Sequence, residues 1–133
     1  MSERVLPIVD DLDTGGFFEA AADGRLAIAH CAHCGAVLHV PRAYCRGCGN
    51  FGIEWRTVEP TGSVYSYIVV THQVHEAFAV PHTIVLVELD DLPGVRLTGW
   101  LAGEPDIHIG QRACTQFEQV ADDTTLPQWR LID

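Results

Sequence analysis

Two closely spaced cysteine pairs constrain this chain more than any other feature of its sequence. Cys31 and Cys34 form the first pair, Cys45 and Cys48 form the second, and each pair reads Cys-x-x-Cys-Gly. In such a turn both thiolates and the following amides can point at one ion, and the glycine takes a conformation that a side chain would obstruct. Four sulfurs make a closed tetrahedral shell. The spacing therefore predicts a structural metal ion, with no position left for substrate.

Other uses of these cysteines fit less well. Two disulfides would suit a secreted mini-protein, but charged residues and no apolar signal segment follow Met1, which predicts a cytoplasmic chain with reduced thiols. A redox pair needs one Cys-x-x-Cys at the start of a helix. Rubredoxin-like iron uses the same four sulfurs, and ligand type alone does not separate it from zinc. Zinc is favoured because nothing else in the chain points to electron transfer.

Composition excludes several kinds of chemistry. The 133 residues, 47% of them apolar, suit one compact domain with a small appended module, and no segment is apolar enough to cross a membrane. All 8 basic residues are arginines, which excludes Schiff-base and P-loop chemistry that needs lysine. The formal net charge of −10 opposes binding to nucleic acid.

The positive charge is concentrated around the cysteines. Between Arg25 and Arg56 there are four arginines and one acid, whereas three arginines and ten acids follow from Ser63 onward. Arg42 and Arg46 flank the start of the second cysteine pair. Their guanidinium groups match a phosphate-bearing small molecule or an acidic partner surface, and ordinary solubilising charge is the alternative.

Turn residues divide the chain into three predicted segments, 1–24, 25–60 and 61–133. The first is predicted to be an extended arm over 1–13 and then a short helix, which Thr14 or a glycine caps and Gly24 ends. A helix this short needs a surface to dock on. Its two aromatic residues are therefore candidate contacts with the body of the protein or with a partner, and they are Phe17 and Phe18.

The fold class predicted from the strand pattern is mainly β. The second segment is predicted to be a zinc ribbon of three strands, at 25–30, 37–40 and 52–58, ending at the turn residues 60–62. The third segment is predicted to be an OB-fold barrel, because five short strands without helices are too few for a sandwich. Cys114 is expected to be a buried residue of this barrel. The five barrel strands are expected at 63–71, 82–89, 95–101, 112–120 and 128–132.

The loop between the first two barrel strands, 72–81, is the candidate ligand site of the barrel. Phe78 is expected to face an acyl chain or a partner, and the alternative is that it caps the barrel. His72, His75 and Glu76 could bind a second metal or act as acid and base, but no nucleophile or carboxylate pair accompanies them.

The order of helix, four-cysteine ribbon and five-stranded barrel resembles one family. The stretches that carry the resemblance are 17–21, 44–49, 54–55, 62–70, 81–89 and 109–112. With them the chain resembles the DUF35 family of OB-fold, acyl-CoA-associated proteins, over nearly its whole length from Phe17. Trp100 departs from the pattern, since smaller residues often occupy that strand, and it could shape a substrate channel or fill the barrel mouth.

The resemblance implies a non-catalytic accessory subunit in a hetero-oligomer. Members of this family typically accompany thiolase-fold enzymes: thiolases, hydroxymethylglutaryl-CoA synthase-type condensing enzymes, and retro-aldolases of steroid side-chain degradation. The partner then carries the catalytic residues, a coenzyme A thioester is the shared ligand, and the zinc is structural. Arg42 and Arg46 become candidates to contact coenzyme A phosphates or the partner.

Two other functions remain open. A zinc ribbon with an OB fold is also a nucleic-acid-binding combination, in which Tyr65, Tyr67 and Trp100 could stack on bases. The acidic barrel opposes it, because single-strand binding needs a basic groove. A free-standing enzyme would need a catalytic constellation, and the sequence offers none that is recognisable.

Overall fold

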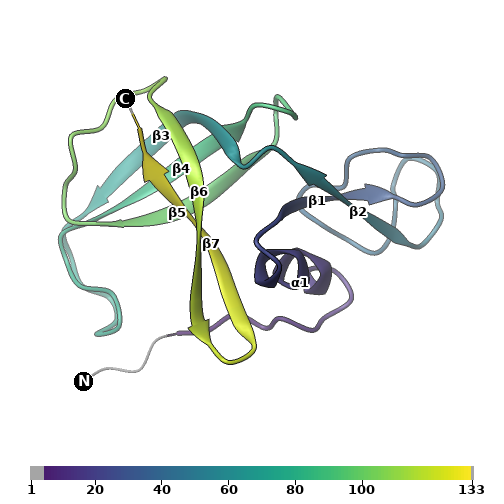
Figure 1. Ribbon diagram of the computed structural model, residues 1–133, viewed down its shortest axis with the longest axis horizontal. Coiled ribbons are helices and arrows are strands. Elements are labelled where there is room, and N and C mark those ends of the chain that lie inside the picture. The colour runs from purple at the N-terminus through teal and green to yellow at the C-terminus, as the bar shows by residue number, and fades with distance from the viewer. Residues whose placement is uncertain (1–4, 133) are drawn as a thin grey trace. The chain divides into compact units, whose positions relative to one another are not determined.

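A computed structural model of the chain describes residues 5–132 (Figure 1). It divides into two compact units: residues 7–58 with 117–126, and residues 59–116 with 127–132 and the first described residues up to Leu6. The mainly β fold with one helix is confirmed, and no described helix could span a membrane. The elements are α1 (Gly15–Ala22), β1 (Leu26–Cys31), β2 (Ile53–Val58), β3 (Thr61–Val70), β4 (His82–Leu89), β5 (Arg96–Ala102), β6 (Arg112–Ala121) and β7 (Thr124–Leu131).

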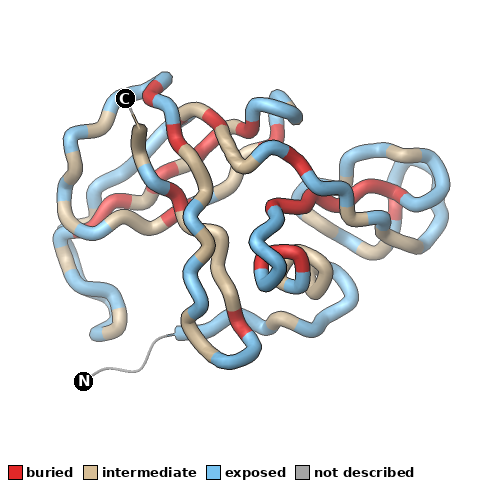
Figure 2. The backbone as a smooth tube through the Cα atoms, in the orientation of Figure 1, coloured by how far each residue is buried: buried red, intermediate tan, exposed pale blue. Residues whose placement is uncertain are grey.

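In the unit of residues 7–58, α1 packs on the two-stranded antiparallel sheet of β1 and β2. All six residues of β1 are buried, as its continuous red colour in Figure 2 shows. The helix buries Ala20 and Ala21. Its Gly16 lies against the indole of Trp55 on β2, and a Cβ at this glycine would be 2.1 Å from Trp55 Nε1. Small residues therefore let the short helix dock closely on the sheet. Of the two docking surfaces considered, the body of the protein covers this face of the helix.

The start of α1 differs from the prediction. Thr14 is the N-cap residue, but its side chain caps no helical N–H, and its hydroxyl instead donates to Asp11 Oδ1. Gly24 ends the helix as predicted, with φ of +74°, a conformation that favours glycine. The predicted arm covers residues 1–13, of which 1–4 lie outside the described residues, and the remainder forms no helix or strand.

The ribbon has two strands instead of the predicted three. Residues 37–40 form no strand and contribute a single bridge, between Val37 and His30. Leu38 N–H still donates to Ala29 O at 2.8 Å, but pairing stops there because the chain turns away through exposed residues toward Pro41. The predicted turn at 60–62 is also wrong, since β3 already begins at Thr61.

The second unit holds the main part of a five-stranded sheet in the order β5-β4-β3-β6-β7. Trp129 of β7 lies against Gly99 of β5, which brings the two edge strands of the sheet together as in a barrel. The predicted last strand was too short, because β7 begins at Thr124 and forms a hairpin with β6. Cys114 lies on β6 as predicted but is only half-buried, because side chains alternate between the faces of a strand and its neighbour Ala113 is the buried one.

A hydrogen-bonded carboxylate ties together three strands of this sheet. Asp90, directly after β4, accepts bonds from Arg112 Nη1 of β6 at 2.8 Å and from Thr61 Oγ1 of β3 at 2.6 Å. The Arg112 bonds, and then the Thr61 bond, lower the pKa of Asp90 from 3.8 to about 2. Because the folded pKa is depressed, the stability that Asp90 contributes is present above about pH 4 and is lost as the pH falls toward 2.

We therefore expect Asp90→Asn to lower Tm by about 3–6 °C at pH 7, a modest effect because the ion pair is partly exposed. The difference in Tm between wild type and Asp90→Asn should shrink as the pH is lowered from 4 toward 2. Thermal denaturation of both proteins across this pH range measures this difference in Tm. Other effects of acid lower the Tm of both proteins alike and do not change the difference. A constant difference down to pH 2 would contradict this assignment.

Candidate metal centre and ligand surfaces

The two cysteine turns have the same backbone geometry. Gly35 N–H donates to Cys31 O at 2.9 Å, and Gly49 N–H donates to Cys45 O at 2.9 Å. Both glycines have positive φ, +76° and +79°. A side chain would strain this left-handed backbone, so the Cys-x-x-Cys-Gly pattern is explained by the turn itself.

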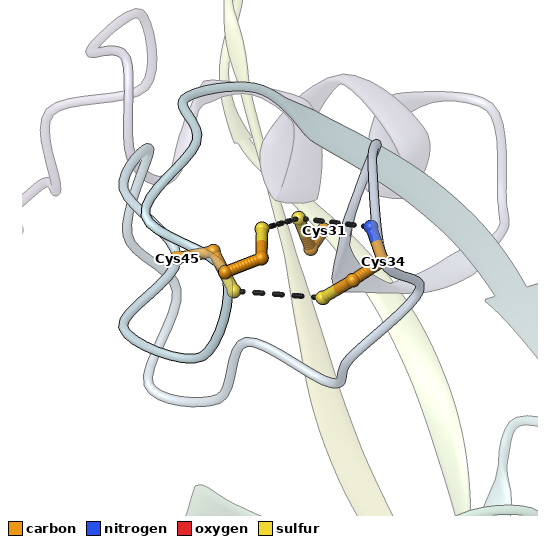
Figure 3. Close-up of side chains that lie close together, drawn as sticks. Cys31, Cys34 and Cys45 are labelled. Atoms are coloured by element: carbon orange, nitrogen blue, oxygen red, sulfur yellow. Dashed lines mark hydrogen bonds between the residues drawn. The ribbon is translucent and has the colours of Figure 1, made fainter.

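The four thiols converge on one point (Figure 3). Their Sγ atoms all lie within 4.8 Å of one another, with Cys31 and Cys48 at 3.6 Å and Cys34 and Cys45 at 3.7 Å. Four sulfurs in a tetrahedron around zinc, with Zn–S bonds near 2.3 Å, lie about 3.8 Å apart. The residues therefore fit a four-sulfur structural zinc ion, which the turns would hold without an open coordination position.

Hydrogen bonds prepare some of these thiols to bind a cation. The N–H groups of Cys34 and His33 point at Cys31 Sγ and lower the pKa of Cys31 to about 6. For Cys34, the Ala36 amide lowers the pKa, but the neighbouring Cys31 and Cys45 sulfurs raise it, to about 11 overall. Four adjacent thiolates repel one another, so a divalent cation is needed to keep all of them ionised.

The segment between the strands of the ribbon has almost no hydrophobic core. Among residues 32–52, only Cys45 is buried, and the segment contains no helix or strand. Figure 2 shows it as mostly exposed. Its conformation therefore depends on the metal, because little apolar burial compensates the entropy of ordering about twenty residues.

The barrel unit carries an apolar face that the cross-strand register creates. Ile68 of β3 pairs with Ile84 of β4, and Ile84 pairs with Trp100 of β5, so these three side chains share one face of the sheet. Val70 and His82 are paired in the next row. A cavity of about 360 Å³ lies on this face, lined by Val70, Val74, His75, Phe78, His82, Ile84 and Trp100.

Phe78 comes to this cavity from the loop between β3 and β4. Its ring lies 6.5 Å from that of Trp100, 6.4 Å from His82 and 6.2 Å from His75, and it keeps 37% of its surface exposed. Phe78 and Trp100, which are 22 positions apart in the sequence, are thus brought together. Ile84 was not a candidate from the sequence, and the place of Ile84 and His82 beside these rings follows only from the strand register.

The loop histidines have structural partners. His75 Nδ1 accepts the Ala77 N–H at 3.0 Å, and His82 Nδ1 donates to Ala79 O at 2.8 Å. In the described part of the chain, the four cysteines are the only group of metal-ligand residues close enough to share an ion, so His72, His75 and Glu76 do not form the second site considered above.

Two further pairs of candidate contact residues lie in the unit that contains residues 7–58. Arg42 and Arg46 line a second cavity, of about 370 Å³, together with the chain from Ala36 to Val40. On α1, the Phe17 and Phe18 rings pack edge to face at 5.4 Å, and both remain half-buried.

Known domain families match both parts of the chain. The rubredoxin-like zinc ribbon domain of ChsH2 matches residues 18–54, and the C-terminal OB-fold domain of ChsH2 matches residues 55–118. A solved structure described as the Ltp2-ChsH2(DUF35) aldolase is 36% identical, with a TM-score of 0.81, over 94% of this chain and 98% of that chain. The chain belongs to the DUF35 family. The zinc ribbon and OB fold predicted from the sequence are thereby confirmed.

More distant or longer relatives are also found. A DUF35 protein of unknown function from Sulfolobus solfataricus has a TM-score of 0.57 at 17% identity, over 89% of this chain and 84% of that chain, which shows a shared fold alone. A curated protein from Thermomonospora curvata, the probable enoyl-CoA hydratase alpha subunit, is 43% identical over 122 residues. The match covers 89% of this chain but 37% of that protein, so the chain spans little more than a third of its length.

Proposed function

We propose that this chain is a non-catalytic accessory subunit of a thiolase-fold acyl-CoA enzyme, in a hetero-oligomer whose shared ligand is a coenzyme A thioester. The DUF35 relative at 36% identity is described as part of an aldolase, which supports a carbon–carbon-cleaving partner. The cytoplasm is the proposed location, because a reducing compartment keeps the four thiols available to zinc.

The strongest support is the apolar face of the barrel. Ile68 and Val74 expose 58% and 86% of their surface beside a cavity with apolar and aromatic walls. Covering such a face with an acyl chain or a partner contributes about 25 cal/mol for each Å² of apolar surface removed from water, against which the entropy cost of association counts. Two histidines, His75 and His82, line the cavity, and the Nδ1 atom of each is bonded to the backbone. The described lining includes no carboxylate, hydroxyl or thiol to act with them, so we assign the cavity to binding and leave the chemistry to the partner.

Trp100 supplies one polar group on this face. Its Nε1 is buried and has no acceptor among the described residues. A buried donor without a partner costs about 1–3 kcal/mol. A thioester carbonyl or a backbone carbonyl of the partner would satisfy it. Phe17 and Phe18 on α1 are proposed as additional partner contacts. Both rings are only half-buried, and aromatic side chains are enriched at protein interfaces.

A hydratase subunit is the second candidate, because the curated relative at 43% identity is a probable enoyl-CoA hydratase alpha subunit. The two candidates share the accessory role and the acyl-CoA ligand, but they differ in the partner. Co-expression of the chain with thiolase-like and hydratase-like proteins of the same genome, followed by assays of aldol cleavage and of enoyl-CoA hydration, separates them.

Phe78→Ala tests the apolar face within whichever complex forms. We expect either affinity for the partner or kcat/KM for the thioester to fall about 10-fold, since truncating a phenylalanine at an interface costs 1 kcal/mol or more. Tyr65→Ala is the matched control, because this exposed ring stacks under Arg96 and does not line the cavity. Unchanged assembly and unchanged turnover in Phe78→Ala would exclude the proposed role of this face.

A further inference from the structure

We propose that the ribbon cavity around Arg42 and Arg46 binds the phosphorylated nucleotide end of the coenzyme A thioester, with Tyr44 and Phe51 as the platform for its base. This inference rests on the proposed function for the identity of the ligand. The ribbon would then be a binding element in its own right, in addition to the metal site that holds it folded.

Among the arginines that the structure describes, these two differ from the others in lacking a partner. Within residues 5–132, each other arginine has a polar contact: Arg25 with Asp23, Arg56 with Glu54, Arg96 with Glu88, Arg112 with Asp90, and Arg130 with Cys114. Arg42 and Arg46 have none in this part of the chain, although both line the same cavity. Two unpaired guanidinium groups on one cavity are suited to an anion with several oxygens.

Carboxylates are few around these arginines in the described part of the chain. Between Arg25 and Arg56 the only acid is Glu54, and its Oε1 accepts a bond from Arg56 at 3.1 Å. Zinc with four thiolates adds a charge of about −2 to a segment at +3, which leaves it positive. Asp13 comes beside this stretch, since its Oδ1 accepts the Ala43 N–H at 2.7 Å. The stretch still carries far less negative charge than the rest of the chain, which favours phosphate binding here.

An exposed pair of aromatic rings lies at this cavity, and one of the two lines it. Tyr44 lines the cavity and is 44% exposed, and Phe51, which is 71% exposed, has its ring 5.3 Å from that of Tyr44. An antiparallel bridge between the two residues holds their backbones together. Stacking of a base on an aromatic side chain contributes about 1–3 kcal/mol.

Phosphate recognition next to a stacking platform fits a nucleotide. A coenzyme A thioester carries both a nucleotide and the acyl group that the proposed function requires. A polynucleotide would offer the same two chemical features, but the net charge of −10 opposes a long polyanion much more than a single nucleotide.

The test uses the zinc-loaded full chain without any partner. Binding of coenzyme A, dephospho-coenzyme A, pantetheine and a single-stranded oligonucleotide is measured by calorimetry or by NMR titration. We expect coenzyme A to bind wild type best, dephospho-coenzyme A more weakly, and pantetheine least. The double variant Arg42→Gln/Arg46→Gln should bind coenzyme A at least 10-fold more weakly, and Tyr44→Ala about 5-fold or more.

The matched control is Arg25→Gln/Arg56→Gln, which removes the same charge from the same unit at arginines that already have acidic partners. It should change affinity less than 2-fold, and zinc content verifies that all variants are folded. Equal weakening in both double variants, no weakening in Arg42→Gln/Arg46→Gln, no binding of coenzyme A by wild type, or tighter binding of the oligonucleotide would each overturn the nucleotide site.

The result is independent of assembly with a thiolase-like enzyme. If no such complex forms while the chain binds coenzyme A through these arginines, the proposed function fails and the nucleotide site stands. If the double variant weakens assembly and leaves coenzyme A affinity unchanged, the arginines contact acids of the partner and the nucleotide site is wrong.

Discussion

Cys45→Ser is expected to release the zinc, unfold residues 32–52 and abolish assembly with a partner. Structural zinc contributes on the order of 10–16 kcal/mol in small zinc domains, and three sulfurs with a weakly binding hydroxyl lose much of that. Residues 32–52 have little other source of order, because Cys45 is the only buried residue of this segment. If a fraction of the Cys45→Ser protein still assembles with the partner, the rate of the chemical step in that complex should be unchanged, since the closed sulfur shell leaves no position for substrate.

Zinc analysis, NMR spectra and co-purification with the partner measure these effects. Wild type should contain about one zinc per chain, and a red iron-containing form would contradict the zinc assignment. Cys114→Ser is the matched control, because it makes the same chemical change at a half-buried cysteine of β6 outside the cluster. A Cys45→Ser protein that assembles normally but loses turnover would indicate that the metal takes part in the reaction.

Gly62→Ala should be the most damaging single methyl addition in the barrel. Gly62 is buried in β3 and pairs with Leu89 of β4 and Ala113 of β6. A Cβ there would lie 2.2 Å from Glu88 O and 2.7 Å from Val87 Cγ1. The first of these atoms is backbone held in the sheet, so the strands themselves must separate. We expect a loss of about 3 kcal/mol and a Tm lower by about 10 °C or more.

Urea or thermal denaturation followed by tryptophan fluorescence checks this prediction. Gly15→Ala serves as the control, since the nearest atom to its added Cβ would be at 3.5 Å, an ordinary contact, and alanine favours a helix. It should be neutral or slightly stabilising. Equal stability of Gly62→Ala and wild type would mean that β3 and β4 are spaced more widely than described.

The metal centre could be predicted from the sequence because its geometry is local. Each Cys-x-x-Cys-Gly turn closes through bonds between residues four apart, and glycines with positive φ make that turn possible. The helix end at Gly24 was predictable for the same reason. The start of β3 at Thr61, where a turn was predicted, was not. Pro60 and Gly62 resemble turn residues, but Gly62 lies in a strand because the sheet leaves no room for a side chain.

The candidate ligand surfaces needed the tertiary structure. Nothing local relates Phe78 to Trp100, or Ile84 to either, because their proximity depends on how three strands align. Likewise, the sequence predicted that Arg42 and Arg46 could contact a phosphate or an acidic partner. Only the structure showed that the other described arginines have partners and that Tyr44 lines the same cavity. By itself, the sequence determined the zinc turns, the mainly β fold class and the charge distribution. The tertiary structure decided which distant side chains share a cavity, since cross-strand register is set by packing over the whole sheet.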